Sequence, residues 1–111
     1  MRLHRNLVFT TIDSLMAIFN EGEYADKVVA RALKKDKRWG SHDRKFVAET
    51  IYEIVRWKRL YVEIAEVKEP FDRDKIWRIF AVWAVLRGYN LPDWKYFEET
   101  PVRRIKGKFD E

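Results

Sequence analysis

Apolar residues recur along this chain at the three- and four-residue spacing of helices, and no stretch shows the pattern of a β-hairpin. The spacing predicts a first helix over about 3–20, with Gly22 as its left-handed C-terminal cap. It predicts a second helix over about 24–37. The apolar positions of these two segments are Val8, Ile12, Leu15, Met16 and Phe19, then Ala25, Val28, Val29, Ala32 and Leu33.

A third helix is expected to begin at Ser41, a good N-cap, and to extend to about Val62. Asp43 then places a carboxylate in its first turn, where it complements the helix dipole. The apolar face comprises Val47, Thr50, Ile51, Ile54, Val55 and Tyr61. The opposite face comprises Lys45, Glu49, Glu53, Arg56 and Arg59, and its mixed charge indicates a solvated surface. Residues 63–69 fit either a continuing helix or an extended link.

The segment over about 74–87 is apolar almost all round, which predicts a central helix, and Asp72 is its expected N-cap. Its length is too short for a membrane span. A turn at 88–93 and a short helix at 93–99 would follow. We therefore expect one compact all-α domain of about five helices over 1–99, and a charged tail or linker over 100–111.

Positive charge is concentrated in one window. The chain has 23 Lys and Arg against 18 Asp and Glu, a net charge of +5, and most of the excess lies between 31 and 45. The run at 34–38 either complements the dipole at a helix end or meets phosphates of a nucleic acid. Trp39, which follows, is either a hydrophobic plug under the turn or an exposed platform for a base.

The composition excludes several kinds of chemistry. The absence of cysteine removes disulfides, thiolate nucleophiles and cysteine metal sites, and fits a reducing cytoplasm. His4 and His42 do not form a metal-binding motif, and four isolated glycines form no phosphate-cradling loop. We therefore expect a cytoplasmic chain with no metal, no cofactor, no membrane segment and no catalytic activity of its own.

A distributed set of residues carries a family resemblance. The set comprises Ala25-Asp26, Val29, Arg31-Ala32-Leu33, Ser41, Asp43-Arg44, Phe46, Glu49, Tyr52, Ile54 and Val55-Arg56, followed by Trp77, Leu86-Arg87-Gly88-Tyr89 and Leu91-Pro92-Asp93-Trp94. In these residues the chain resembles the NusB-like N-terminal domain of the Sun/RsmB group of rRNA cytosine-5 methyltransferases, over about residues 3–97.

The resemblance implies an all-α NusB fold and an RNA-binding role. Relatives bind RNA either as a free antitermination factor or as an accessory module fused to a methyltransferase. The catalytic part of those enzymes needs a cysteine nucleophile and an S-adenosylmethionine site, and this sequence provides neither. We therefore expect an accessory domain, with S-adenosylmethionine bound only by a catalytic domain elsewhere in a longer polypeptide.

The resemblance also suggests where RNA, most plausibly rRNA, would bind. Relatives place basic residues of the N-terminal helix at the RNA, and Arg2 and Arg5, with His4 between them, match. Judged by charge alone, these three residues are also consistent with a solvated chain terminus that has no binding role. The complete set of predicted RNA-binding residues is Arg2, His4, Arg5, Lys34, Lys35, Lys37 and Arg38. Ser41, Asp43 and Arg44 receive a structural role at the helix start, as caps or an ion pair.

Two rival functions remain open. One is a protein-interaction module that docks on a catalytic domain, a ribosomal protein or a second copy. The other is a free NusB-like antitermination factor. RNA binding predicts a steep salt dependence, whereas a docking module predicts an exposed apolar patch.

Overall fold

The computed structural model describes residues 2–110, and the side chains of residues 2–108. Within that range the chain forms six α-helices and one 3₁₀ helix, and no strand. They are α1 (Arg5–Glu21), α2 (Ala25–Ala32), α3 (Ser41–Arg56), α4 (Lys58–Ala65), α5 (Arg73–Leu86), η1 (Lys95–Phe97) and α6 (Val102–Asp110). The all-α class is confirmed, with six α-helices in place of about five.

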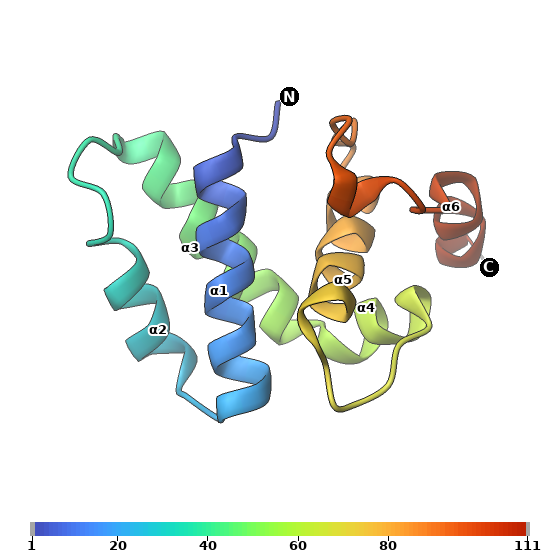
Figure 1. Cartoon of the computed structure of the whole chain (residues 1–111), viewed down its shortest axis with the longest axis horizontal. Coiled ribbons are helices and arrows are strands. Elements are labelled where there is room, and N and C mark those ends of the chain that lie inside the picture. The colour runs from blue at the N-terminus through green and yellow to red at the C-terminus, as the bar shows by residue number, and fades with distance from the viewer. Residues whose placement is uncertain (1, 111) are drawn as a thin grey trace.

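The helices form two groups that meet along α1 and α5 (Figure 1). α1 packs against α2 and α3 on one side and against α5 on the other. It ends as predicted at Gly22, whose φ of 69° is left-handed, and the amides of Gly22 and Glu23 both donate to the carbonyl of Ala17. α1 therefore supplies core residues to both groups.

α2 ends at Ala32, so the prediction of a helix to residue 37 is wrong. The carboxylate of Asp36 accepts a hydrogen bond from the backbone amide of Arg38 at 2.9 Å. Such a local bond offers the backbone an alternative to the helix. Only Arg31 lies in the last turn of α2, so Lys37 and Arg38 do not complement its dipole.

α3 begins with Ser41, and the N-cap is Gly40 instead of the predicted Ser41. Asp43 consequently lies three residues after the cap, and its carboxylate accepts from the Gly40 amide at 3.2 Å. The helix also ends earlier than predicted, at Arg56. Trp57 adopts φ −108° and ψ 30° and separates α3 from α4, which packs against α5.

α5 is the central helix, as predicted. The Asp72 side chain caps it by accepting from the Lys75 amide at 2.9 Å, and nine of its residues are buried. At its end, Gly88 has φ 86°, and the Tyr89 amide donates to the Ala84 carbonyl at 2.9 Å. This left-handed ending turns the chain toward the loop that carries Trp94.

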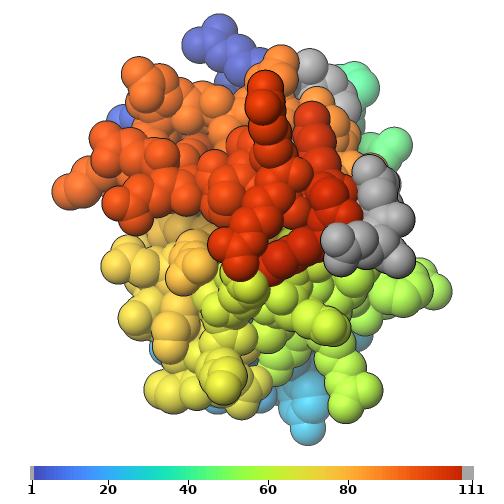
Figure 2. Space-filling view, turned by 90° about the vertical axis from the view of Figure 1, so that its right-hand side faces the viewer, coloured from blue at the N-terminus to red at the C-terminus, as the bar shows by residue number. Residues whose placement is uncertain are grey.

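Residues 102–110 form α6, so the prediction of a tail with little periodicity is wrong. Ile105 is 3% exposed within the main core, and Arg104 and Lys108 both pair with Glu66 at the end of α4. Figure 2 shows the C-terminal segment (red) lying over α4 (yellow-green). Whether this stretch also leads to a further domain stays a prediction. In the described part of the chain, no helix has the length and apolarity needed to cross a membrane.

Candidate nucleic-acid interface

Three of the predicted RNA-binding residues line one groove. Arg2, His4 and Arg5 precede or begin α1, and they face the loop at 90–94 across a groove of about 480 Å³. Figure 1 shows the N-terminal segment and the loop after α5 at the same end of the molecule. The lining of this N-terminal groove is Arg2, Leu3, His4, Arg5, Asn90, Leu91, Pro92 and Trp94. Since none of these is an Asp or Glu, the cations meet no carboxylate there.

An aromatic ring is fixed inside the N-terminal groove. The guanidinium carbon of Arg5 lies 5.1 Å from the centre of the Trp94 ring, within the range of a cation–π contact. Trp94 also stacks on the buried Phe97, with ring centres 5.6 Å apart. Packing therefore holds the indole and the guanidinium in defined positions. The apolar sequence context of Trp94 predicts a place in the core, and an aromatic residue in a basic chain was the one signal of a binding role.

The start of α1 adds polarity to the same groove. His4 is the N-cap, and its side chain makes no capping hydrogen bond. The first turn contains no acidic residue. Because the first backbone N–H groups of a helix lack intrahelical partners, they favour a negatively charged group. Helix geometry and side-chain charge thus both select for an anion at this end.

The second predicted group, at 34–38, lies in the loop between α2 and α3 and is partly neutralised. Arg38 binds the Asp36 carboxylate at 2.8 and 3.0 Å. These bonds, and the one from the Arg38 amide, lower the pKa of Asp36 to about 2. Lys34 and Lys37 form no ion pair with any residue that the structure describes.

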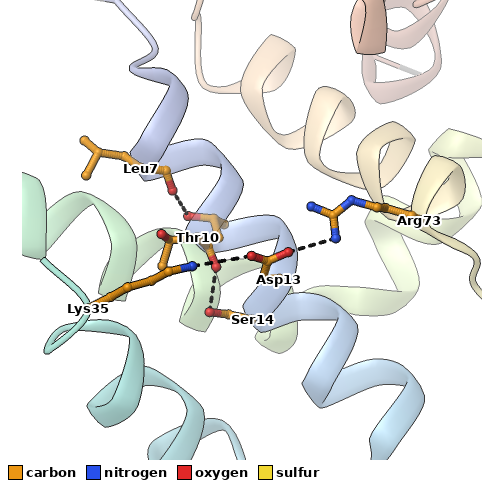
Figure 3. A network of polar contacts seen from close by, with 7 residues as sticks. Leu7, Thr10, Asp13, Ser14, Lys35 and Arg73 are labelled. Atoms are coloured by element: carbon orange, nitrogen blue, oxygen red, sulfur yellow. Dashed lines mark hydrogen bonds and ion pairs between the residues drawn. The ribbon is translucent and has the colours of Figure 1, made fainter.

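Lys35 belongs to a network centred on Asp13 of α1 (Figure 3). Its Nζ lies 3.5 Å from one Asp13 oxygen, and Arg73 of α5 lies 2.8 Å from the other. Next to them, the Ser14 hydroxyl donates to the Thr10 carbonyl at 2.7 Å. Asp13 therefore links the loop after α2 to the start of α5, and it reduces the charge that Lys35 offers to a polyanion.

The seven predicted RNA-binding residues do not form one site. Arg2, His4 and Arg5 share the N-terminal groove, whereas Lys34 and Lys35 line a separate recess between α1 and α2. Lys37 and Arg38 line neither of these. The structure thus brings together the N-terminal set and leaves the loop set apart from it.

The three residues predicted to have a structural role at the start of α3 do not act together. Asp43 bonds the Gly40 amide, but Ser41 and Arg44 are exposed. Asp43 and Arg44 form no ion pair with each other. The helix start is therefore held by one carboxylate, and the ion pair predicted there is absent.

Two tryptophans differ sharply in environment. Trp39 packs on the cluster formed by Leu7, Val29, Ala32, Val47 and Ile51, so it is the plug under the turn. The apolar sequence context of Trp57 predicts a place in the core, and that prediction is wrong, because its side chain is 50% exposed. It stands where α3 ends and α4 begins, on a different surface from the N-terminal groove.

The described residues contain no group of three or more His, Asp or Glu suited to a metal ion. Comparison of the chain with protein-family models, with curated proteins and with solved structures yielded no match. The resemblance to the Sun/RsmB group therefore stays a prediction from the residues quoted above.

Proposed function

We propose that this chain is an RNA-binding accessory domain with a NusB-like fold, which positions rRNA for an S-adenosylmethionine-dependent cytosine-5 methyltransferase. The observation that carries the RNA-binding part is the N-terminal groove. It combines Arg2, His4 and Arg5 with the fixed indole of Trp94 and has no carboxylate in its lining. The methyltransferase part rests on the family resemblance.

The chemistry of the groove suits a phosphate backbone. Arg2 and Arg5 carry charge at all physiological pH values, and their planar guanidinium groups can donate two hydrogen bonds to one phosphate. Asn90 offers an amide to a sugar or base edge, and Trp94 holds the Arg5 guanidinium at the groove. Contacts of this kind fix the position of an RNA and read its shape more than its sequence.

The structure makes some of the other predicted RNA contacts less favourable than others. Lys35 and Arg38 already face carboxylates, so binding RNA through them requires exchanging one anionic partner for another. Lys34 and Lys37 are exposed and carry no such cost. We therefore assign the main contacts to Arg2, His4 and Arg5, with Lys34 and Lys37 as secondary contacts.

The proposed role is non-catalytic. In this proposal S-adenosylmethionine binds to a catalytic domain of the same polypeptide, and the residues present here hold and orient RNA. The working location of such a module is the cytoplasm, where rRNA is modified and assembled.

Titration of in vitro transcribed rRNA with the chain, at several salt concentrations, tests the proposal. Affinity should fall steeply with salt, with a log–log slope of about −0.7 to −0.9 for each neutralised phosphate. The double variant R2A/R5A should bind at least about tenfold more weakly. Its log–log salt slope should be shallower by about two. The matched control is K68A/K106A, which removes the same charge from exposed positions outside the groove.

Two results would count against the proposal. A salt-independent affinity would exclude phosphate contacts as its source. Equal losses in R2A/R5A and K68A/K106A would show that net charge, and not the groove, attracts the RNA.

A further inference from the structure

Three exposed aromatic side chains lie outside the N-terminal groove, in the region of α2, α3 and α4. Tyr24 is 76% exposed, Tyr52 42% and Trp57 50%, and Leu60 beside them is 37% exposed. They lie where α2 begins, along the last turns of α3, and where α4 begins. We call Tyr24, Tyr52 and Trp57 the aromatic platform. A half-exposed tryptophan in a domain of this size is an unusual use of a large apolar side chain, because burial would stabilise the fold.

Specific contacts hold two members of the aromatic platform, Tyr52 and Trp57. The Tyr52 hydroxyl donates to the Asp26 carboxylate at 2.6 Å, which fixes Tyr52 of α3 against the first turn of α2. Arg56 lies one helical turn after Tyr52, on the same face of α3. Its guanidinium carbon is 5.6 Å from the centre of the Trp57 ring. Tyr52 and Arg56 therefore share one face of α3, and Arg56 connects that face to Trp57 at the end of the helix.

Cations accompany the rings, and two carboxylates of the same region are engaged by other side chains. Lys27 Nζ lies 6.0 Å from the centre of the Tyr24 ring. Lys27, Arg56 and Arg59 form no ion pair with any residue that the structure describes. In contrast, Asp26 bonds Tyr52, and Glu53 bonds Trp83 and Arg87. The platform is thus flanked by charge that is available to an anion.

We propose that the aromatic platform binds an unpaired, single-stranded segment of RNA. Bases stack on the exposed indole of Trp57 and on the neighbouring tyrosines, while phosphates meet Lys27, Arg56 and Arg59. Rings interleaved with cations suit single strands, because every base has a face that can stack, whereas the bases of a duplex are already stacked on each other. This inference rests on the proposed RNA-binding function, and adds to the groove a second contact with a different preference.

Fluorescence anisotropy with two labelled probes tests the inference. One is an oligouridylate of about 12 nucleotides, a length within the range that single-strand-binding modules cover. The other is a blunt RNA duplex of the same length. W57A should weaken binding of the oligouridylate about tenfold, the loss of roughly one stacked base, and leave duplex binding unchanged. W57F, which keeps an aromatic ring, should retain most of the affinity.

The matched control is Y96A, because Tyr96 is another exposed aromatic residue, at 44%, but stacks on Trp77 outside the platform. It should leave the affinity for the oligouridylate unchanged. Thermal melts of each variant, followed by circular dichroism, separate a loss of contact from a loss of fold. Ultraviolet cross-linking of the oligouridylate to the wild-type chain provides a second readout, and the cross-linked peptide should contain Trp57 or Tyr52.

The outcomes separate this inference from the proposed function. If the wild-type chain binds the duplex but W57A binds the oligouridylate as tightly as wild type, the platform inference is wrong and the groove stands. If the wild-type chain binds neither these probes nor rRNA, the proposed function itself fails. Trp57-dependent self-association of the chain, with unchanged affinity of W57A for the oligouridylate, would make the platform a protein-docking surface and would also overturn the inference.

Discussion

The indole N–H of Trp83 in α5 donates to the carboxylate of Glu53 in α3 at 3.1 Å. The same carboxylate accepts from Arg87 at 3.2 Å. Trp83 is only 3% exposed, so this bond satisfies a donor that water does not reach freely. Glu53 thereby joins two helices that lie on either side of the core. The prediction that it lies on a solvated face is wrong, because the side chains of Trp83 and Arg87 reach it from α5 and leave it 26% exposed.

Removing the Glu53 carboxylate should therefore destabilise the fold. E53A leaves the Trp83 N–H without its partner, which costs about 1–3 kcal/mol in the free energy of unfolding. E53Q keeps an acceptor and should cost less. Urea denaturation followed by tryptophan fluorescence measures both. The control is E49A, because Glu49 is exposed and lies 4.0 Å from its partner Lys45; a loss in E49A as large as in E53A would contradict the assignment.

α6 should contribute measurably to stability through Ile105. This side chain is 3% exposed and packs within the main core. I105A removes buried apolar volume, and about 2–4 kcal/mol of the free energy of unfolding should be lost. K106A, which changes the exposed neighbour, should be close to neutral. If I105A melts at the wild-type temperature, α6 is not part of the cooperative fold.

The elements predicted well from the sequence are those with dense apolar periodicity and a local stop signal. α1 and α5 have both, since Gly22 and Gly88 follow their last apolar residues and adopt positive φ. α6 was missed although Val102, Ile105 and Phe109 have the i, i+3, i+7 spacing of a helix, because charged residues dominate this short segment. The early end of α2 was missed because residues 33–37 suit a helix by composition, whereas the chain leaves the helix through local turn bonds such as that of the Lys35 amide to the Ala32 carbonyl at 3.1 Å.

The candidate site was predictable only in part, for a different reason. The N-terminal cations are close together in sequence, so their shared groove follows from one short segment. Trp94, however, is far from these cations in the sequence, and the turn after α5 brings it to the groove. Likewise, Lys35 pairs with Asp13, 22 residues away. Local charge patterns carry no information about such distant partners. The exposure of Trp57 likewise depends on where α3 ends and α4 begins.

The Arg38–Asp36 pair should be visible in the acid titration of the chain. The hydrogen bonds from Arg38 hold the pKa of Asp36 at about 2, below the ordinary aspartate value of 3.8. Because the folded-state pKa is lowered, the stabilisation is complete above about pH 4 and is lost as the pH falls toward 2. Carboxyl chemical shifts from NMR measure this directly. In R38A the pKa of Asp36 should rise toward 3.8, and an unchanged value would show that the pair does not form in solution.

Asp13 should weaken RNA binding by competing for Lys35. The carboxylate lies 3.5 Å from Lys35 and 2.8 Å from Arg73. D13N removes that competition, so rRNA should bind about two- to fivefold more tightly at low salt, and the salt slope should steepen by up to about one. Because exposed ion pairs each contribute about 0–1 kcal/mol, the fold should persist. The control is D74N, which removes one negative charge from an exposed residue that lines neither the N-terminal groove nor the recess beside Lys35. Equal tightening in D13N and D74N would assign the effect to net charge, whereas tightening confined to D13N would place Lys35 among the RNA contacts despite its partner.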